Sequence, residues 1–164
     1  MIINIKDHNT LQVDDFKLKC VVGKKGFTSN KVEGDQKTPI GLFDIENLYY
    51  RSDRIEKPNT RLRCIKINKK MGWCDDILSK KYYNKLIRVN KKVKHEKLFR
   101  KDHKYDFILP IKYNFKKPLL GKGSCIFIHL TKNYKPTAGC IALNEKDFSI
   151  LIKIIDKKTK IRIL

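Results

Sequence analysis

Apolar and polar residues alternate in several short segments of the chain, as expected for strands with one face in a core. The alternating segments are residues 16–22, 40–45, 62–67 and 159–164. Two further apolar runs, 105–109 and 124–129, are bounded by glycine and proline, and the second indicates a strand buried on both faces. The pattern therefore predicts a mainly β protein.

One helix is predicted near the C-terminus. Asn144 is a good N-cap, and Glu145 and Asp147 place negative charge in the first turn, where the helix dipole favours it. The helix is expected to end at residues 157–158, a pair of lysines. Its core-facing residues recur at helical spacing: Phe148, Leu151, Ile152 and Ile155.

Residues 71–104 are rich in charge and show no clear period, so we expect loops with short helical turns inserted into the sheet. A chain of 164 residues and 19.4 kDa without repeats or linkers predicts a single domain, residues 1–164. No apolar run approaches the ~20 residues of a membrane span, and no signal peptide is visible at the start.

The chain is strongly basic, with 38 Lys and Arg against 17 Asp and Glu and a formal net charge of +21. Such a charge attracts nucleic acid, anionic lipid and acidic wall polymers alike. The excess is nearly all lysine, scattered along the chain, whereas base recognition favours arginine. We therefore expect solvated lysine-rich faces and no specific nucleic-acid site.

Five cysteines form an odd set with no CxxC pair, and the four histidines add no second pair of ligands. We expect no structural metal, no cofactor and at least one free thiol. Three of the cysteines have apolar neighbours and are interpreted as small core residues: Cys20, Cys64 and Cys125.

The candidate chemistry lies between His129 and Cys140. A buried strand ends at His129, a polar loop follows, and Gly139–Cys140 opens the next apolar run. A nearby base or cation can activate a thiol, and a glycine allows backbone amides to face a developing oxyanion. Spacing alone leaves two interpretations open, a catalytic pair or two packed residues.

Four ordered stretches resemble a known family. They are Gly34-Asp35-x-x-Thr38-Pro39-x-Gly41-x-Phe43, Gly72-Trp73-Cys74-Asp75-Asp76 with Tyr83-Asn84, Tyr105-Asp106 with Tyr113-Asn114, and Thr137-Ala138-Gly139-Cys140-Ile141-Ala142-Leu143 with His129. Together they resemble the L,D-transpeptidase catalytic domain (YkuD-like) family, and most closely a compact bacterial subgroup with GxGSxIFxHL…PTxGCxAL.

The resemblance implies a β-sandwich or barrel-like catalytic fold with a helix after the nucleophile and a loop-rich insert. It implies that Cys140 attacks a peptidoglycan stem peptide and expels a terminal D-amino acid, with His129 as the base, held by a backbone carbonyl. The thioester then passes to an amine or to water. Amides of Gly139 and Cys140 are expected to form the oxyanion hole, in a loop shaped by Thr137.

The chain departs from the family pattern at two positions. Ala138 replaces a histidine and Ala142 an arginine that many members carry, and only ten residues separate His129 from Cys140. Substrate contacts must then come from elsewhere, and the candidates are Trp73, Asp75, Asp76 and Tyr83. The alternative interpretation is that Trp73 is a core residue and that the paired acids Asp75 and Asp76 form a solvated turn.

The sequence is compatible with three functions. They are a monomeric L,D-transpeptidase of the bacterial periplasm or cell envelope, an L,D-carboxypeptidase of the same fold, and a basic module that binds anionic polymers without catalysis.

Overall fold

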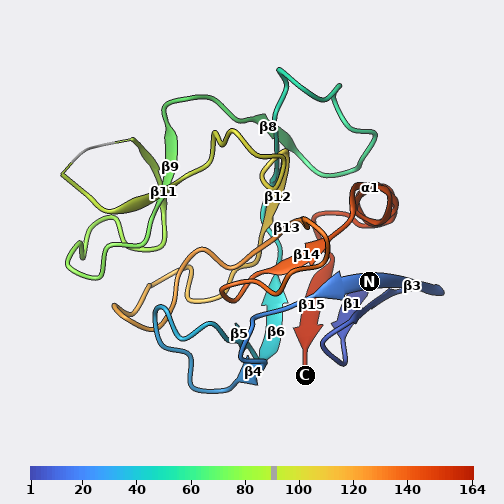
Figure 1. Cartoon of the computed structure of the whole chain (residues 1–164), viewed down its shortest axis with the longest axis horizontal. Helices are drawn as coiled ribbons and strands as arrows, with labels where there is room; N and C mark the ends of the chain where they lie inside the picture. Colours follow the sequence, from blue (N-terminus) through green and yellow to red (C-terminus); the bar gives the residue numbers. More distant parts are fainter. Residues whose placement is uncertain (90–91) are drawn as a thin grey trace.

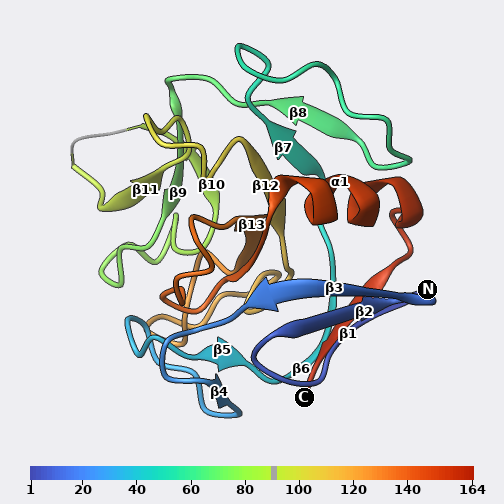
Figure 2. The same ribbon diagram turned by 45° about the vertical axis from the view of Figure 1, so that its right-hand side comes forward.

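Most strands belong to one sheet that curls into a half-barrel, with the single helix across its concave side (Figures 1 and 2). The computed structural model describes residues 1–89 and 92–164. In spatial order the ten strands are β6 (Gly41–Asp44), β15 (Lys160–Ile163), β1 (Ile2–Ile5), β2 (Thr10–Val13), β3 (Phe16–Val21), β14 (Ile141–Leu143), β13 (Phe127–Leu130), β12 (Phe107–Pro110), β7 (Leu48–Tyr50) and β8 (Cys64–Lys66). The prediction of a mainly β fold is confirmed.

The strands predicted from alternation are present with slightly shorter bounds, and the β1–β2 hairpin is an addition that we did not predict. Every residue of β12 and β13 is buried, because these strands lie in the middle of the sheet between β7 and β14. The sheet is mixed: β1–β15, β13–β14 and β7–β8 pair in parallel. Between β3 and β6 the chain forms a separate small parallel pair, β4 (Phe27–Thr28) and β5 (Thr38–Pro39), after the turn at residues 23–26.

The helix α1 (Glu145–Ile154) begins where the sequence predicts, with the Asn144 side chain accepting the Asp147 N–H at 2.8 Å. Its apolar face packs on the sheet, and the Phe148 ring stacks on Phe107 with centroids 5.1 Å apart. A single buried cluster therefore joins the helix to the central strands.

The predicted end of the helix at residues 157–158 is wrong. The helix ends at Ile154, and Ile155 caps it in an extended conformation while remaining buried. Asp156 then forms a local turn in which its N–H donates to the Thr159 hydroxyl at 3.0 Å. This turn satisfies the backbone without another helical turn and leads directly into β15.

The prediction of loops with helical turns for residues 71–104 is also wrong over the described part of that range. It contains a separate antiparallel sheet of β10 (Leu86–Arg88), β9 (Met71–Cys74) and β11 (His95–Lys97), which projects to one side of the half-barrel (Figure 2). These strands are short and none of them combines with its neighbouring residues into a clear alternating segment, which explains the error.

The cysteines predicted as core residues are packed as expected. Cys20 and Cys125 are buried, and Cys64 is half-buried against the core; all five thiols are free. Among the described residues, no helix is long and apolar enough to cross a membrane.

Candidate active site

The register of two parallel strands brings His129 and Cys140 together. His129 on β13 pairs with Ala142 on β14, and Cys140 lies two residues before Ala142. Side chains two residues apart on a strand share a face, so Cys140 and His129 lie on the same face of neighbouring strands. The apolar runs that enclose both residues explain why these strands occupy the middle of the sheet.

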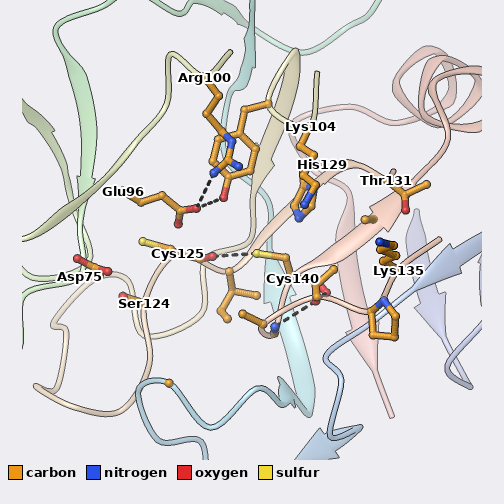
Figure 3. A pocket seen from close by; sticks show the side chains of 18 of the residues that line it. Asp75, Glu96, Arg100, Lys104, Ser124, Cys125, His129, Thr131, Lys135 and Cys140 are labelled. Atoms are coloured by element: carbon orange, nitrogen blue, oxygen red, sulfur yellow. Dashed lines mark hydrogen bonds and ion pairs between the residues drawn. The ribbon is translucent and has the colours of Figure 1, made fainter. Parts of the chain in front are cut away.

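Both residues line one cavity of about 420 Å³ between these central strands of the large sheet and the projecting three-stranded sheet (Figure 3). The lining residues come from segments far apart in the chain: they fall within 31–34, 94–105, 124–126 and 129–142, together with Asp75. The tertiary fold therefore assembles the cavity around the loop that joins His129 to Cys140.

The imidazole of His129 is held as a neutral ring. Its Nδ1 lies 2.8 Å from the carbonyl oxygen of Leu130, which assigns the proton to Nδ1 and leaves the lone pair on Nε2. The ring packs edge-on against Tyr105 with centroids 5.3 Å apart. Burial, with the positive charges of Lys104 and Arg100, lowers the pKa of His129 to about 4.

The thiol of Cys140 is also neutral at rest. Its S–H donates to the carbonyl oxygen of Cys125 at 3.1 Å, and its sulfur accepts the N–H of Phe127 at 3.4 Å. Burial and the nearby carboxylate of Glu96 raise the pKa of Cys140 to about 12. The Cys125 carbonyl reaches the thiol from a left-handed backbone conformation, with φ of 54°.

The loop before Cys140 is tightly packed. Gly139 has a φ of +142°, and a Cβ there would lie 2.8 Å from the carbonyl oxygen of Lys37. The Gly139 carbonyl accepts the Thr38 hydroxyl at 2.9 Å. The Thr137 hydroxyl accepts the Gly139 N–H at 3.1 Å and donates to the Cys140 carbonyl at 2.6 Å, which closes a compact turn before Cys140.

Acidic residues occupy the opposite end of the cavity. Glu96 accepts a hydrogen bond from the Tyr105 hydroxyl, and its burial raises its pKa. Asp75 is paired with Lys94 at 3.6 Å, yet its buried Oδ1 has no hydrogen-bond partner within residues 1–89 and 92–164. Asp76 is outside the cavity lining, and its carboxylate accepts the main-chain N–H of Lys94 at 3.2 Å.

The structure does not bring the two aromatic candidates to the cavity. Trp73 is buried, packs edge-on against Phe127 at 5.2 Å and donates its Nε1–H to Asn84 at 3.0 Å. Tyr83 is also buried, and its hydroxyl donates to Glu33 at 2.5 Å. Of the four candidates for substrate contact, only Asp75 lines the cavity.

Several cavity residues were not identified from the sequence as site residues. Tyr105 lies in one of the four stretches that resemble the family, and Thr131 lies two residues after His129. The sequence offered no other signal for either residue. The others come from charge-rich segments with no pattern of their own: Glu96, Arg100, Lys104, Lys132 and Lys135.

Comparison with known proteins places the whole arrangement in one family. A family model described as the L,D-transpeptidase catalytic domain, YkuD, matches residues 1–163. Searches of curated proteins and of solved structures return no match. The matched range includes both strands of the Cys140–His129 pair and nearly all of the chain, so this protein belongs to the YkuD family of L,D-transpeptidase catalytic domains.

Proposed function

We propose that this protein is a cysteine-dependent L,D-transpeptidase that acts on peptidoglycan stem peptides. The observation that supports the proposal most directly is that His129, on β13, and Cys140, directly before the parallel strand β14, line one cavity. The family has L,D-transpeptidase-type activity and generally acts on the cell wall in the envelope. We accordingly propose that the chain works as a monomer on the wall, in the periplasm or envelope of a bacterium.

The protonation states suggest how the first step proceeds. Burial lowers the pKa of His129 and raises the pKa of Cys140, which favours the neutral form of both groups before substrate binds. Nε2 of His129 accepts the S–H proton while the sulfur of Cys140 attacks the carbonyl carbon of the L-residue. As the carbon–nitrogen bond breaks, the imidazolium returns that proton to the departing amine of the terminal D-residue.

The remaining thioester on Cys140 is then resolved by a second nucleophile. His129, neutral again, takes a proton from an incoming amine or water. An amine on a second stem forms a new amide and therefore a crosslink. Water releases a shortened stem, which is the carboxypeptidase outcome of the same chemistry.

We assign the oxyanion hole to the amides of Gly139 and Cys140. At rest the Gly139 N–H donates to the neutral hydroxyl of Thr137 at 3.1 Å. An oxyanion can replace that acceptor, because a charged oxygen binds an amide more strongly than a hydroxyl does. Ala138, where many relatives carry histidine, adds no polar side chain, so the backbone of this loop provides the stabilisation.

A mass measurement tests the nucleophile. The family resemblance implies that a carbapenem acylates Cys140, which intact-mass analysis and peptide mapping would detect. Cys140→Ala is expected to abolish both adduct and turnover. Matched alanine variants of the other core cysteines should retain both: Cys20, Cys64 and Cys125. An adduct on another cysteine, or none at all, would refute the assignment.

A second assay separates crosslinking from hydrolysis. Purified enzyme is incubated with a labelled stem peptide, with and without an amine acceptor. Only a transpeptidase produces a dimer when the acceptor is present. Shortened monomer in both reactions would make the protein a carboxypeptidase of the same fold. Strong salt-dependent retention on polyanions with no thiol reactivity would instead favour the binding-module alternative.

A further inference from the structure

The end of the cavity beyond His129 contains a buried hydroxyl without a partner. Thr131 is 8% exposed, and its Oγ1 makes no hydrogen bond to any residue that the structure describes. Its backbone is fixed at both sides: the N–H donates to Leu143 O at 2.7 Å, and the carbonyl lies 2.9 Å from Nε2 of His103. Thr131 therefore lines the cavity from a fixed place, and its buried hydroxyl has unused hydrogen-bonding capacity.

The same end carries unpaired positive charge. Lys104, Lys132 and Lys135 line the cavity, and none forms an ion pair with another residue in the described ranges. Figure 3 shows Lys104, Lys135 and Thr131 on the side of His129, away from the acidic end.

Two carboxylates at the acidic end, those of Asp75 and Glu96, have positively charged neighbours within the protein. Asp75 has Lys94 at 3.6 Å, and Glu96 lies 3.9 Å from Arg100, which it shares with the closer Asp102 at 2.6 Å. The cavity is therefore polarised, with its uncompensated positive charge beside Thr131. A ligand group that accepts a hydrogen bond and carries negative charge suits this end, and the free terminal carboxylate of a stem peptide is such a group.

We infer that Thr131, with Lys104, Lys132 and Lys135, forms a subsite for the free terminal carboxylate of the donor peptide. The inference rests on the proposed function and adds which end of the substrate occupies which end of the cavity. The residue that leaves then lies between His129, which protonates its nitrogen, and Thr131, which binds its carboxylate.

The spacing of the two residues suits this assignment. Thr131 follows β13 directly and is two residues after His129, a separation of about 6.6 Å along an extended chain. One amino-acid residue, hydrogen-bonded at its nitrogen and at its carboxylate, fits such a span. The protein would then remove or exchange only a terminal residue. It would also supply from Thr131 and the lysines the contacts that Ala138 and Ala142 cannot make.

Binding to a variant that cannot react tests the subsite independently of the chemistry. Calorimetry on Cys140→Ala compares two stem peptides that differ only at the C-terminus, one a carboxylate and the other a carboxamide. We expect the carboxylate peptide to bind about tenfold more tightly. Adding Thr131→Val, nearly equal in volume, should remove most of this preference, and Thr131→Ser in its place should keep it.

The lysines offer a matched control. Lys135→Met in the Cys140→Ala background should reduce the preference severalfold. Lys94→Met should leave it unchanged, because Lys94 also lines the cavity but is already paired with Asp75. Equal affinity of Cys140→Ala for the two peptides would overturn the inference. A Thr131→Val substitution that weakens binding of the carboxylate and the carboxamide peptide by the same factor would also overturn it.

Turnover by the unmodified enzyme distinguishes this inference from the proposed function. If Cys140→Ala prefers the carboxylate and the wild type forms no thioester, the subsite stands and the proposed reaction is wrong. If the wild type turns over the peptides while Cys140→Ala binds both equally, the reaction stands and the subsite is wrong.

Discussion

The neutral resting state of Cys140 predicts an unusually unreactive thiol in the free enzyme. At pH 7, a free cysteine with a pKa of about 8.5 is roughly 3% thiolate, whereas a pKa of about 12 leaves about 10⁻⁵. The thiolate fraction of Cys140 is thus about 3.5 orders of magnitude below that of free cysteine. A more basic thiolate is intrinsically more nucleophilic, and this offsets about 1.5 of those orders of magnitude. Alkylation of Cys140 by iodoacetamide should therefore be about 10²-fold slower than that of free cysteine.

The assay is the rate of alkylation between pH 6 and pH 10, with Cys140 followed by peptide mass mapping. The rate should rise through the whole range without a plateau, because the pKa of the thiol lies above it. His129→Gln should scarcely change this profile, since no ion pair is present at rest, yet it should abolish turnover. Cys140→Ala serves as the control for alkylation at other sites.

A different profile would refute the reasoning. If the rate reaches a plateau with a midpoint below pH 7, and His129→Gln removes that plateau, the two residues form a thiolate–imidazolium pair at rest. The polar contacts around the sulfur, and not its burial, would then control its protonation.

Other contacts predict separate outcomes. Gly139→Ala places a Cβ 2.8 Å from the Lys37 carbonyl oxygen at a φ of +142°, so thermal denaturation should show a loss of about 2 kcal/mol or more. Asp75→Asn should raise KM for an acceptor amine severalfold in the dimer assay, whereas Asp76→Asn, outside the cavity, should not. The free energy of unfolding should fall by about 3 kcal/mol as the pH drops from 6.5 to 4, because the unfolded chain binds a proton that buried His129, with its pKa lowered to about 4, does not. In urea denaturation, the His129→Gln variant should lack this pH-dependent loss of unfolding free energy.

Local signals in the sequence were sufficient for much of the fold. Alternation located β3, β6 and β15, and Asn144 located the start of α1, because strand faces and helix caps depend on residues near in the chain. The end of α1 was misplaced because the turn from Asp156 to Thr159 replaces a further helical turn, and the apolar spacing used for the prediction does not register that turn. The three-stranded sheet was missed because its strands pair across long, charged loops and show no period of their own.

The sequence by itself determined that the protein is mainly β, where its helix begins, and that His129 and Cys140 belong to one motif. Only the tertiary structure decided the rest. Burial raises the pKa of the Cys140 thiol and lowers that of the His129 imidazole, and burial is a property of the packed chain that no spacing reveals. The polarised cavity likewise exists only because the fold gathers Asp75, Glu96 and Thr131 from separate elements around the same pair.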